Sequence, residues 1–188
     1  IELNPENAYA YRGRGYVYDE VGDHWGVIDD CTKAIELEPH FASAHLLYYN
    51  RGNAKNSLGE YRKAVNDYSK AIKVNPGFAY AYFARGKTYN SLGKCRKAVK
   101  DFNKVIKLTP DDASAYFTRG KTYNSLGIYR KAVNDFNKVI TLDPEYAGAY
   151  ASRGDANRML FEYQNSVDDY TKAIERTPED VDAYRYRG

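Results

Sequence analysis

The stretch AYAYFARGKTYNSLGKCRKAVKDFNKVIKLTP, residues 79–110, contains the pattern that decides the fold. Apolar or small residues recur in it at spacings of three and four, which is the period of an α-helix that buries one face. Gly93 interrupts the pattern near its middle, where a helix end is expected, and Pro110 closes the second half. The stretch therefore predicts two helices that fold back on each other as an antiparallel hairpin.

The same pattern recurs along the whole chain of 188 residues. Its six prolines are separated by 34, 37, 34, 34 and 34 residues, and a fixed period of this length is typical of stacked repeats. We predict a single array with repeat 1 at 8–41, repeat 2 at 42–78, repeat 3 at 79–112, repeat 4 at 113–146, repeat 5 at 147–180 and the start of a sixth first helix at 181–188. Repeat 2 has three extra residues near 46–50, so its first helix is expected either to begin one turn early, which we favour, or to contain a bulge.

Residues at fixed places in each unit resemble the tetratricopeptide repeat family. In repeat 4 they are Tyr116 and Gly120 in the first half, and Ala132 and Phe136 in the second. The resemblance covers the whole chain and implies an all-α fold, a right-handed superhelical α-solenoid of stacked antiparallel helical hairpins. In that fold the first (A) helices line a concave groove and the second (B) helices lie outside. We expect the glycine to face the alanine and the aromatic residues to fill the space between hairpins.

One pair of charged residues recurs in all five repeats. An arginine precedes the A-helix glycine, and an aspartate precedes the B-helix aromatic residue, or Cys31 in repeat 1. The pairs are Arg14 and Asp30, Arg51 and Asp67, Arg85 and Asp101, Arg119 and Asp135, and Arg153 and Asp169. A guanidinium can bind a carboxylate through two hydrogen bonds while its stem packs. We predict an Arg–Asp contact between A and B helices of the same or adjacent hairpins; the alternative is that both side chains are solvated and persist through duplication.

One side of the A helices is the candidate binding surface. Aromatic residues offer apolar anchors there, lysines attract acidic groups, and asparagines can donate to and accept from a peptide backbone. The candidate groove residues are Arg12, Tyr16, Tyr49, Asn50, Asn53, Asn56, Phe83, Lys87, Asn90, Phe117, Lys121, Asn124, Asp155 and Arg158. The alternative is that these polar side chains only keep this side of the A helices hydrated and bind no partner.

The carboxylate clamp with which family members hold chaperone tails is not expected. The clamp positions correspond here to Arg12, Tyr16, Asn50, Tyr80 and Ala84, and of these only Asn50 has the residue type that the clamp requires.

The net charge of +3 hides a strong variation along the chain. Residues 1–50 have 3 basic and 9 acidic side chains, residues 51–141 have 19 and 6, and residues 142–188 have 6 and 10. Much of the central excess falls on the predicted B helices. This basic outer band comprises Arg62, Lys63, Arg96, Lys97, Lys100, Lys104, Arg130, Lys131 and Lys138. It would attract an acidic protein, a nucleic acid or the acidic end of another copy, unless it is only a solvated face.

The sequence offers no arrangement of catalytic or metal-binding residues. His40 and His45 are five residues apart, which does not place two ligands on one helical face. His24 takes the place of a tyrosine, and Cys31 and Cys95 each replace an aromatic residue, so all three are predicted to pack. We predict that the chain is not an enzyme and needs no cofactor or metal.

The predicted function is a non-catalytic scaffold that binds a peptide or partner protein, of acidic character, in the groove. The alternative is a self-assembling array that oligomerises through end faces or charge-complementary surfaces, because the chain reads as a segment of a longer array. Nucleic-acid binding ranks third, since few aromatic residues interleave with the basic band. No apolar run of about 18 residues suggests a membrane span, and two cysteines suit the reducing cytoplasm.

Overall fold

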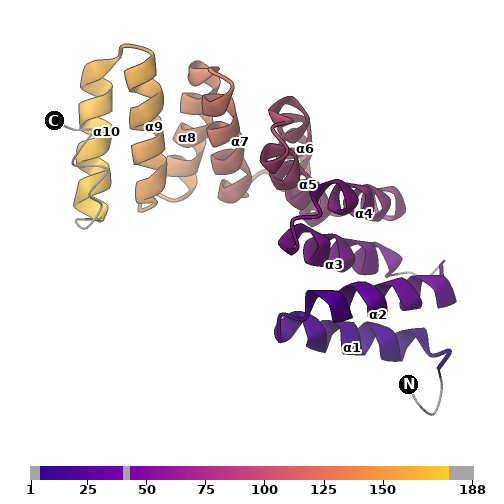
Figure 1. Cartoon of the computed structure of the whole chain (residues 1–188). Coiled ribbons are helices and arrows are strands. Elements are labelled where there is room, and N and C mark those ends of the chain that lie inside the picture. Colours follow the sequence, from indigo (N-terminus) through magenta and orange to yellow (C-terminus); the bar gives the residue numbers. More distant parts are fainter. Residues whose placement is uncertain (1–4, 40–42, 178–188) are drawn as a thin grey trace. The chain divides into compact units, whose positions relative to one another are not determined.

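A computed structural model describes residues 5–39 and 43–177, and the regular secondary structure of these two stretches is entirely α-helical (Figure 1). The first unit, which ends at Lys94, contains α1 (Ala8–Glu20), α2 (His24–Leu37), α3 (Ala44–Ser57), α4 (Tyr61–Val74) and α5 (Ala79–Ser91). The second unit begins at Cys95 and contains α6 (Cys95–Leu108), α7 (Ala113–Ser125), α8 (Tyr129–Leu142), α9 (Ala147–Met159) and α10 (Tyr163–Arg176). His40 and the predicted sixth A helix at 181–188 lie outside the described residues.

Within each unit, helices that follow one another in sequence pack side by side. The A helices α1, α3, α7 and α9 pack on the B helices α2, α4, α8 and α10 of their own hairpins. Each B helix also packs on the next A helix, as α2 does on α3 and α8 does on α9. This alternation confirms the predicted all-α solenoid of antiparallel helical hairpins.

Local sequence signals set where the helices begin and where the hairpins turn. The side chains of Asn7, Asp23 and Asp112 accept hydrogen bonds from backbone N–H groups in the first turns of α1, α2 and α7. Inside the hairpins, Gly59 and Gly127 adopt φ angles of 75° and 71°, which glycine reaches without steric cost. Short turns of this kind force the two helices of a hairpin to lie antiparallel.

The first helix of repeat 2 is continuous through residues 46–50. It begins five residues after Pro39, whereas α1, α5, α7 and α9 begin three residues after their prolines. It is also one residue longer, with 14 residues against 13. Two of the three extra residues therefore precede α3 and only one lengthens it, so the helix does not begin a full turn early.

The repeated spacing of glycine and aromatic residues has a steric origin inside the second and fourth hairpins. A Cβ atom at Gly52 would lie 2.7 Å from Cε1 of Tyr68, and one at Gly120 would lie 2.7 Å from Cε1 of Phe136. Both rings are fully buried. The glycine therefore makes room for the aromatic ring of the facing helix. That it also faces the alanine stays a prediction.

The first hairpin lacks this constraint because Cys31 stands where the other B helices have a ring. A Cβ atom at Gly15 would lie 3.5 Å from Cβ of Asp30 and 3.9 Å from Sγ of Cys31, which are ordinary van der Waals distances. The same substitution is therefore expected to have opposite effects in two hairpins.

We predict that Gly120→Ala lowers the free energy of unfolding by about 1 to 3 kcal/mol, because the buried Phe136 ring must move. Gly15→Ala should raise it by up to about 1 kcal/mol, because alanine stabilises a helix relative to glycine. Urea unfolding monitored by circular dichroism measures both. Two changes of the same sign would contradict the steric explanation.

Candidate functional site

An arginine–aspartate pair joins the two helices of every hairpin that lies within one unit. Arg51 on α3 donates from Nε and Nη2 to Asp67 on α4, at 2.9 and 2.8 Å. The same two-bond contact joins Arg14 to Asp30, Arg119 to Asp135 and Arg153 to Asp169. The predicted contact is thus confirmed in these four pairs, and both partners belong to the same hairpin. Arg85 and Asp101 lie in different units.

The remaining guanidinium nitrogen connects each hairpin to the one before it. Nη1 of the arginine donates to a small polar side chain that directly follows the B-helix aromatic residue, or Cys31, of the preceding hairpin. The pairs are Arg51–Thr32, Arg85–Ser69, Arg119–Asn103 and Arg153–Asn137, at 2.9, 2.9, 2.7 and 2.5 Å. Sequence reasoning missed these acceptors, although a Ser, Thr or Asn at this place in every repeat was the available signal.

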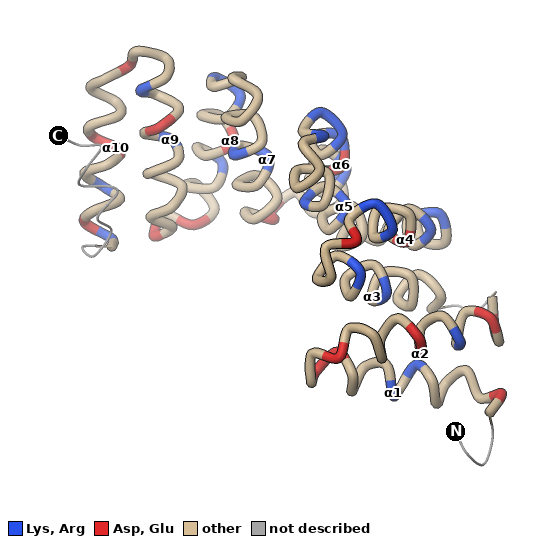
Figure 2. Tube along the Cα trace, in the orientation of Figure 1, with Lys and Arg blue, Asp and Glu red and all other residues tan. Residues whose placement is uncertain are grey.

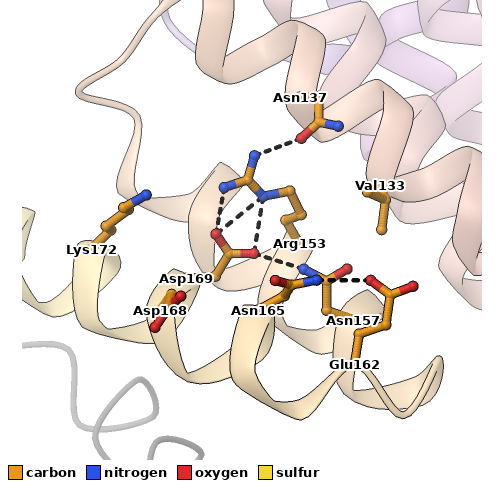
Figure 3. Close-up of a pocket in the computed structure, with 9 residues that line it drawn as sticks. All are labelled: Val133, Asn137, Arg153, Asn157, Glu162, Asn165, Asp168, Asp169 and Lys172. Atoms are coloured by element: carbon orange, nitrogen blue, oxygen red, sulfur yellow. Dashed lines mark hydrogen bonds and ion pairs between the residues drawn. The ribbon is translucent and has the colours of Figure 1, made fainter.

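A polar hollow of the second unit is built around one such arginine (Figure 3). Residues of α8, α9 and α10 and of the α9–α10 turn enclose a cavity of about 280 Å³. At its floor Arg153 is bound by Asp169 and Asn137, and Asn157 donates to Asp169 at 2.9 Å. Arg153 and Asp169 at the floor are therefore engaged with each other and with the two asparagines.

The B-helix ring decides whether the groove-side residue of the same hairpin is engaged. Where the ring is tyrosine, its hydroxyl donates to a groove acceptor: Tyr68 to Oδ1 of Asn53 at 2.9 Å, and Tyr170 to Oδ1 of Asp155 at 2.7 Å. Burial is the main cause that raises the pKa of the Tyr68 hydroxyl, so it stays protonated and donates.

Where the B-helix ring is phenylalanine, the groove residue is a lysine. Phe136 has no hydroxyl, and Lys121 of the same hairpin is exposed, with Nζ 5.6 Å from the centre of the Phe117 ring. Lys87 on α5 is likewise exposed, with Nζ 5.9 Å from the Phe83 ring. Among the predicted groove residues, Asn53 and Asp155 therefore accept hydrogen bonds from buried tyrosines. Lys87 and Lys121 are exposed and form no ion pair among the described residues.

Two of the predicted groove aromatics also join consecutive hairpins. Tyr49 packs against Phe78, just ahead of α5, with ring centres 5.2 Å apart. Phe117 makes the corresponding contact with Tyr146, just ahead of α9, at 4.9 Å. Both residues are half-buried, so only part of each ring remains for a ligand.

Several predicted asparagines link neighbouring A helices. Asn56 on α3 accepts from Oγ1 of Thr88 on α5 at 2.9 Å. Asn124 on α7 donates to the Ser152 carbonyl on α9 at 3.4 Å, and its own Oδ1 accepts no hydrogen bond from the described residues. Asn90 occupies the corresponding place on α5. The amides of Asn56 and Asn124 thus connect successive A helices.

The remaining predicted groove residues lie on α1, α3 and α9. Arg12 lies 5.2 Å from the ring of Tyr9 in its own helix. Tyr16 on α1 is exposed, and Asn50 on α3 is half-buried. Arg158 lies 3.9 Å from Asp155.

The predicted basic side chains of the B helices are mostly exposed. The exposed ones are Arg62 and Lys63 on α4, Arg96, Lys97 and Lys100 on α6, and Arg130 and Lys131 on α8. Figure 2 marks the lysine and arginine positions along these helices in blue. Lys104 and Lys138 are half-buried. Partner binding on this band stays a prediction.

Within residues 5–39 and 43–177, no group of three or more His, Cys, Asp and Glu side chains is arranged to hold a metal ion. Cys31 is buried as predicted, and burial raises the pKa of its thiol to about 12, so the thiol is not a nucleophile at neutral pH. Cys95 is only half-buried. No described helix combines the length and hydropathy needed to cross a bilayer. The absence of catalysis remains a prediction from the sequence.

The geometry defines a solenoid of helical hairpins held together by repeated polar contacts. The family model described as TPR repeat matches residues 52–93 and 86–127, and the one described as tetratricopeptide repeat matches residues 113–146. Together they span about half of the chain. The chain belongs to the tetratricopeptide repeat family.

Solved structures support the same fold. A tetratricopeptide repeat protein from Parabacteroides merdae is 23% identical, with a TM-score of 0.88 over 96% of this chain and 70% of that one. YrrB, described as a TPR protein with an unusual peptide-binding site, is 23% identical, with a TM-score of 0.86 over 98% and 94%. MamA from Desulfovibrio magneticus is 22% identical, with a TM-score of 0.85 over 93% and 97%. No curated protein sequence matches the chain.

The Arg51–Asp67 pair gives a testable dependence of stability on pH. Desolvation raises the pKa of Asp67, but hydrogen bonds from Arg51 and Lys55 outweigh it, and the net pKa is lowered. A lowered carboxylate pKa stabilises the fold above the ordinary aspartate value of about 3.9, and this stabilisation is lost as the pH falls through the lowered value.

We predict that Asp67→Asn lowers the free energy of unfolding at pH 7 by about 3 kcal/mol, because it leaves buried cations unpaired. The control Glu60→Gln, at an exposed ion pair, should cost less than about 0.5 kcal/mol. Urea unfolding between pH 7 and about pH 2 should show a shallower loss for Asp67→Asn than for the wild type. Equal losses would mean that the pair does not contribute as described.

Proposed function

We propose that the chain is a protein-interaction scaffold whose α7–α9 face binds an extended peptide or partner segment with an acidic side chain next to an apolar one. The observation that supports this most directly is the free ammonium group of Lys121. It is exposed and makes no ion pair among the described residues. An acidic group could pair with it while an apolar neighbour contacts the uncovered part of the Phe117 ring.

The spacing on α7 suits an extended ligand. Phe117, Lys121 and Asn124 are four and three residues apart, so they share one side of the helix. They span about 10 Å along the helix axis, which equals about three residues of an extended peptide. The amide of Asn124 can donate and accept, and its Oδ1 lacks a donor, so a small rotation would allow it to bind a peptide N–H.

The engaged groove residues contribute differently. Asp155 accepts from the Tyr170 hydroxyl and lies 3.9 Å from Nη2 of Arg158, so its carboxylate is engaged within its own hairpin. Lys87 presents the corresponding free cation on α5 in the first unit. Membership of the tetratricopeptide repeat family and the similarity to YrrB, whose description names a peptide-binding site, support an interaction function for this face.

The test is a selection from a random peptide library displayed on phage, followed by fluorescence polarisation of the enriched peptides. We expect enrichment of sequences that pair Asp or Glu with an apolar residue. Lys121→Ala should weaken their binding about 10-fold, as for the loss of one desolvated charge pair.

Lys131→Ala is the matched control. Lys131 is also exposed and also lies over a ring, 5.7 Å from the centre of Tyr123, but it belongs to the outer band. Enrichment without acidic residues, or equal weakening by the two substitutions, would contradict the proposed groove function.

A further inference from the structure

The turn between α9 and α10 has a phenylalanine where the other hairpins have glycine. Gly22, Gly59, Gly93 and Gly127 adopt φ angles of 76°, 75°, 70° and 71°, and Phe161 at the corresponding place adopts 62°. A bulky L-residue is strained in this left-handed conformation, whereas glycine is not. Phe161 is the one non-glycine residue with positive φ in the described chain. Fold stability therefore does not explain its presence.

The Phe161 side chain also does little packing in its own unit. It is 77% exposed, and Tyr163, 60% exposed, contacts it edge-on with ring centres 6.2 Å apart. Met159 at the end of α9 is 43% exposed. We call these three residues the Phe161 knob. Grouped exposed apolar side chains of this kind mark an interaction surface.

The knob has an acidic neighbour. Glu162 follows Phe161 directly and is exposed. It accepts a hydrogen bond from the neutral amide of Asn165 at 3.0 Å and makes no ion pair within the described residues. A surface that binds the knob should therefore combine an apolar hollow with a free cation.

The first unit contains a hollow of that description at the α3–α4 turn. A cavity of about 340 Å³ is lined by Gly59, Glu60, Tyr61, Arg62, Lys63 and Leu92. Its apolar surface comes from Leu92, the Tyr61 ring and the stems of the two basic residues. It is large enough for an aromatic side chain, because a cavity of about 150 Å³ can hold benzene.

The cation at the rim of this hollow is Arg62. Lys63 is paired with Glu60 at 2.8 Å, so these two charges compensate each other. Arg62 is exposed and forms no ion pair among the described residues. The rim thus offers the one free charge that Glu162 would need.

We propose that the Phe161 knob of one copy docks into this hollow on a second copy, with Glu162 beside Arg62. The charge distribution along the chain favours this pairing, since residues 142–188 have 10 acidic and 6 basic side chains and residues 51–141 have 6 and 19. Knob and hollow are different surfaces, so the contact is head-to-tail and leaves one of each free for further copies. The inference is independent of peptide binding at the groove.

The first experiment measures self-association of the 188-residue chain by sedimentation velocity. A contact of this size is expected to be weak, so concentrations from about 10 µM to about 1 mM are needed. Phe161→Gly should weaken association at least about 10-fold, because it removes the central apolar anchor. The same variant should unfold about 2 to 4 °C higher, because the backbone strain is released, so unfolding cannot account for the loss. Tyr80→Ala is the control, since Tyr80 is 69% exposed and outside both surfaces.

The second experiment exchanges the charges. Glu162→Arg and Arg62→Glu should each weaken self-association, and an equimolar mixture of the two variants should associate like the wild type. The mixture contains one interface with the native pair of charges and one with the pair reversed.

A wild type that stays monomeric over this concentration range would overturn the proposal. So would a Phe161→Gly variant that associates like the wild type, a Tyr80→Ala variant that loses association equally, or a mixture of charge variants that does not recover.

Discussion

The arginine that binds within its own hairpin and reaches the preceding one, as Arg51, Arg119 and Arg153 do, is the contact on which the stack depends. A guanidinium has five N–H donors in a rigid plane, and the solenoid uses one on each of its three nitrogens. Two nitrogens bind the aspartate of the same hairpin, and the third reaches a Ser, Thr or Asn of the preceding one. One side chain therefore fixes the pairing of two helices and the register of two hairpins. Lysine, a point charge with no planar fork, could not do both.

Next to that arginine, the glycine and the facing aromatic ring set the distance between the two helices of a hairpin. The same ring also affects the candidate groove side of the A helix. A tyrosine such as Tyr68 or Tyr170 engages its groove neighbour through its hydroxyl. A phenylalanine such as Phe136 leaves the groove position to a free lysine. Hairpins with a ring hydroxyl in the core thus engage the groove residue through it, whereas the hairpin of Phe136 has an exposed lysine at that position.

Departures from the repeat pattern carry the most information about individual hairpins. Cys31 replaces a ring and loosens the steric demand at Gly15, with no strain and no exposed surface. Phe161 replaces a glycine, and it introduces both a strained backbone conformation and an exposed apolar side chain. The first departure is explained by packing within the hairpin, whereas the second is unexplained until a partner surface is considered.

By itself the sequence determined the helices, their turns and the antiparallel pairing, because each follows from spacing along a single repeat. It predicted an arginine–aspartate contact but left open which hairpins the partners belong to, and the structure placed both partners in the same hairpin. Tertiary structure decided the rest: that glycine faces a ring, that Thr32, Ser69, Asn103 and Asn137 accept from the next hairpin, and that Asn53 is engaged while Lys121 is free. These facts depend on distances between helices of facing or successive hairpins. A repeat pattern gives the phase of each residue on its own helix, but it does not give the side chain that it meets across the interface.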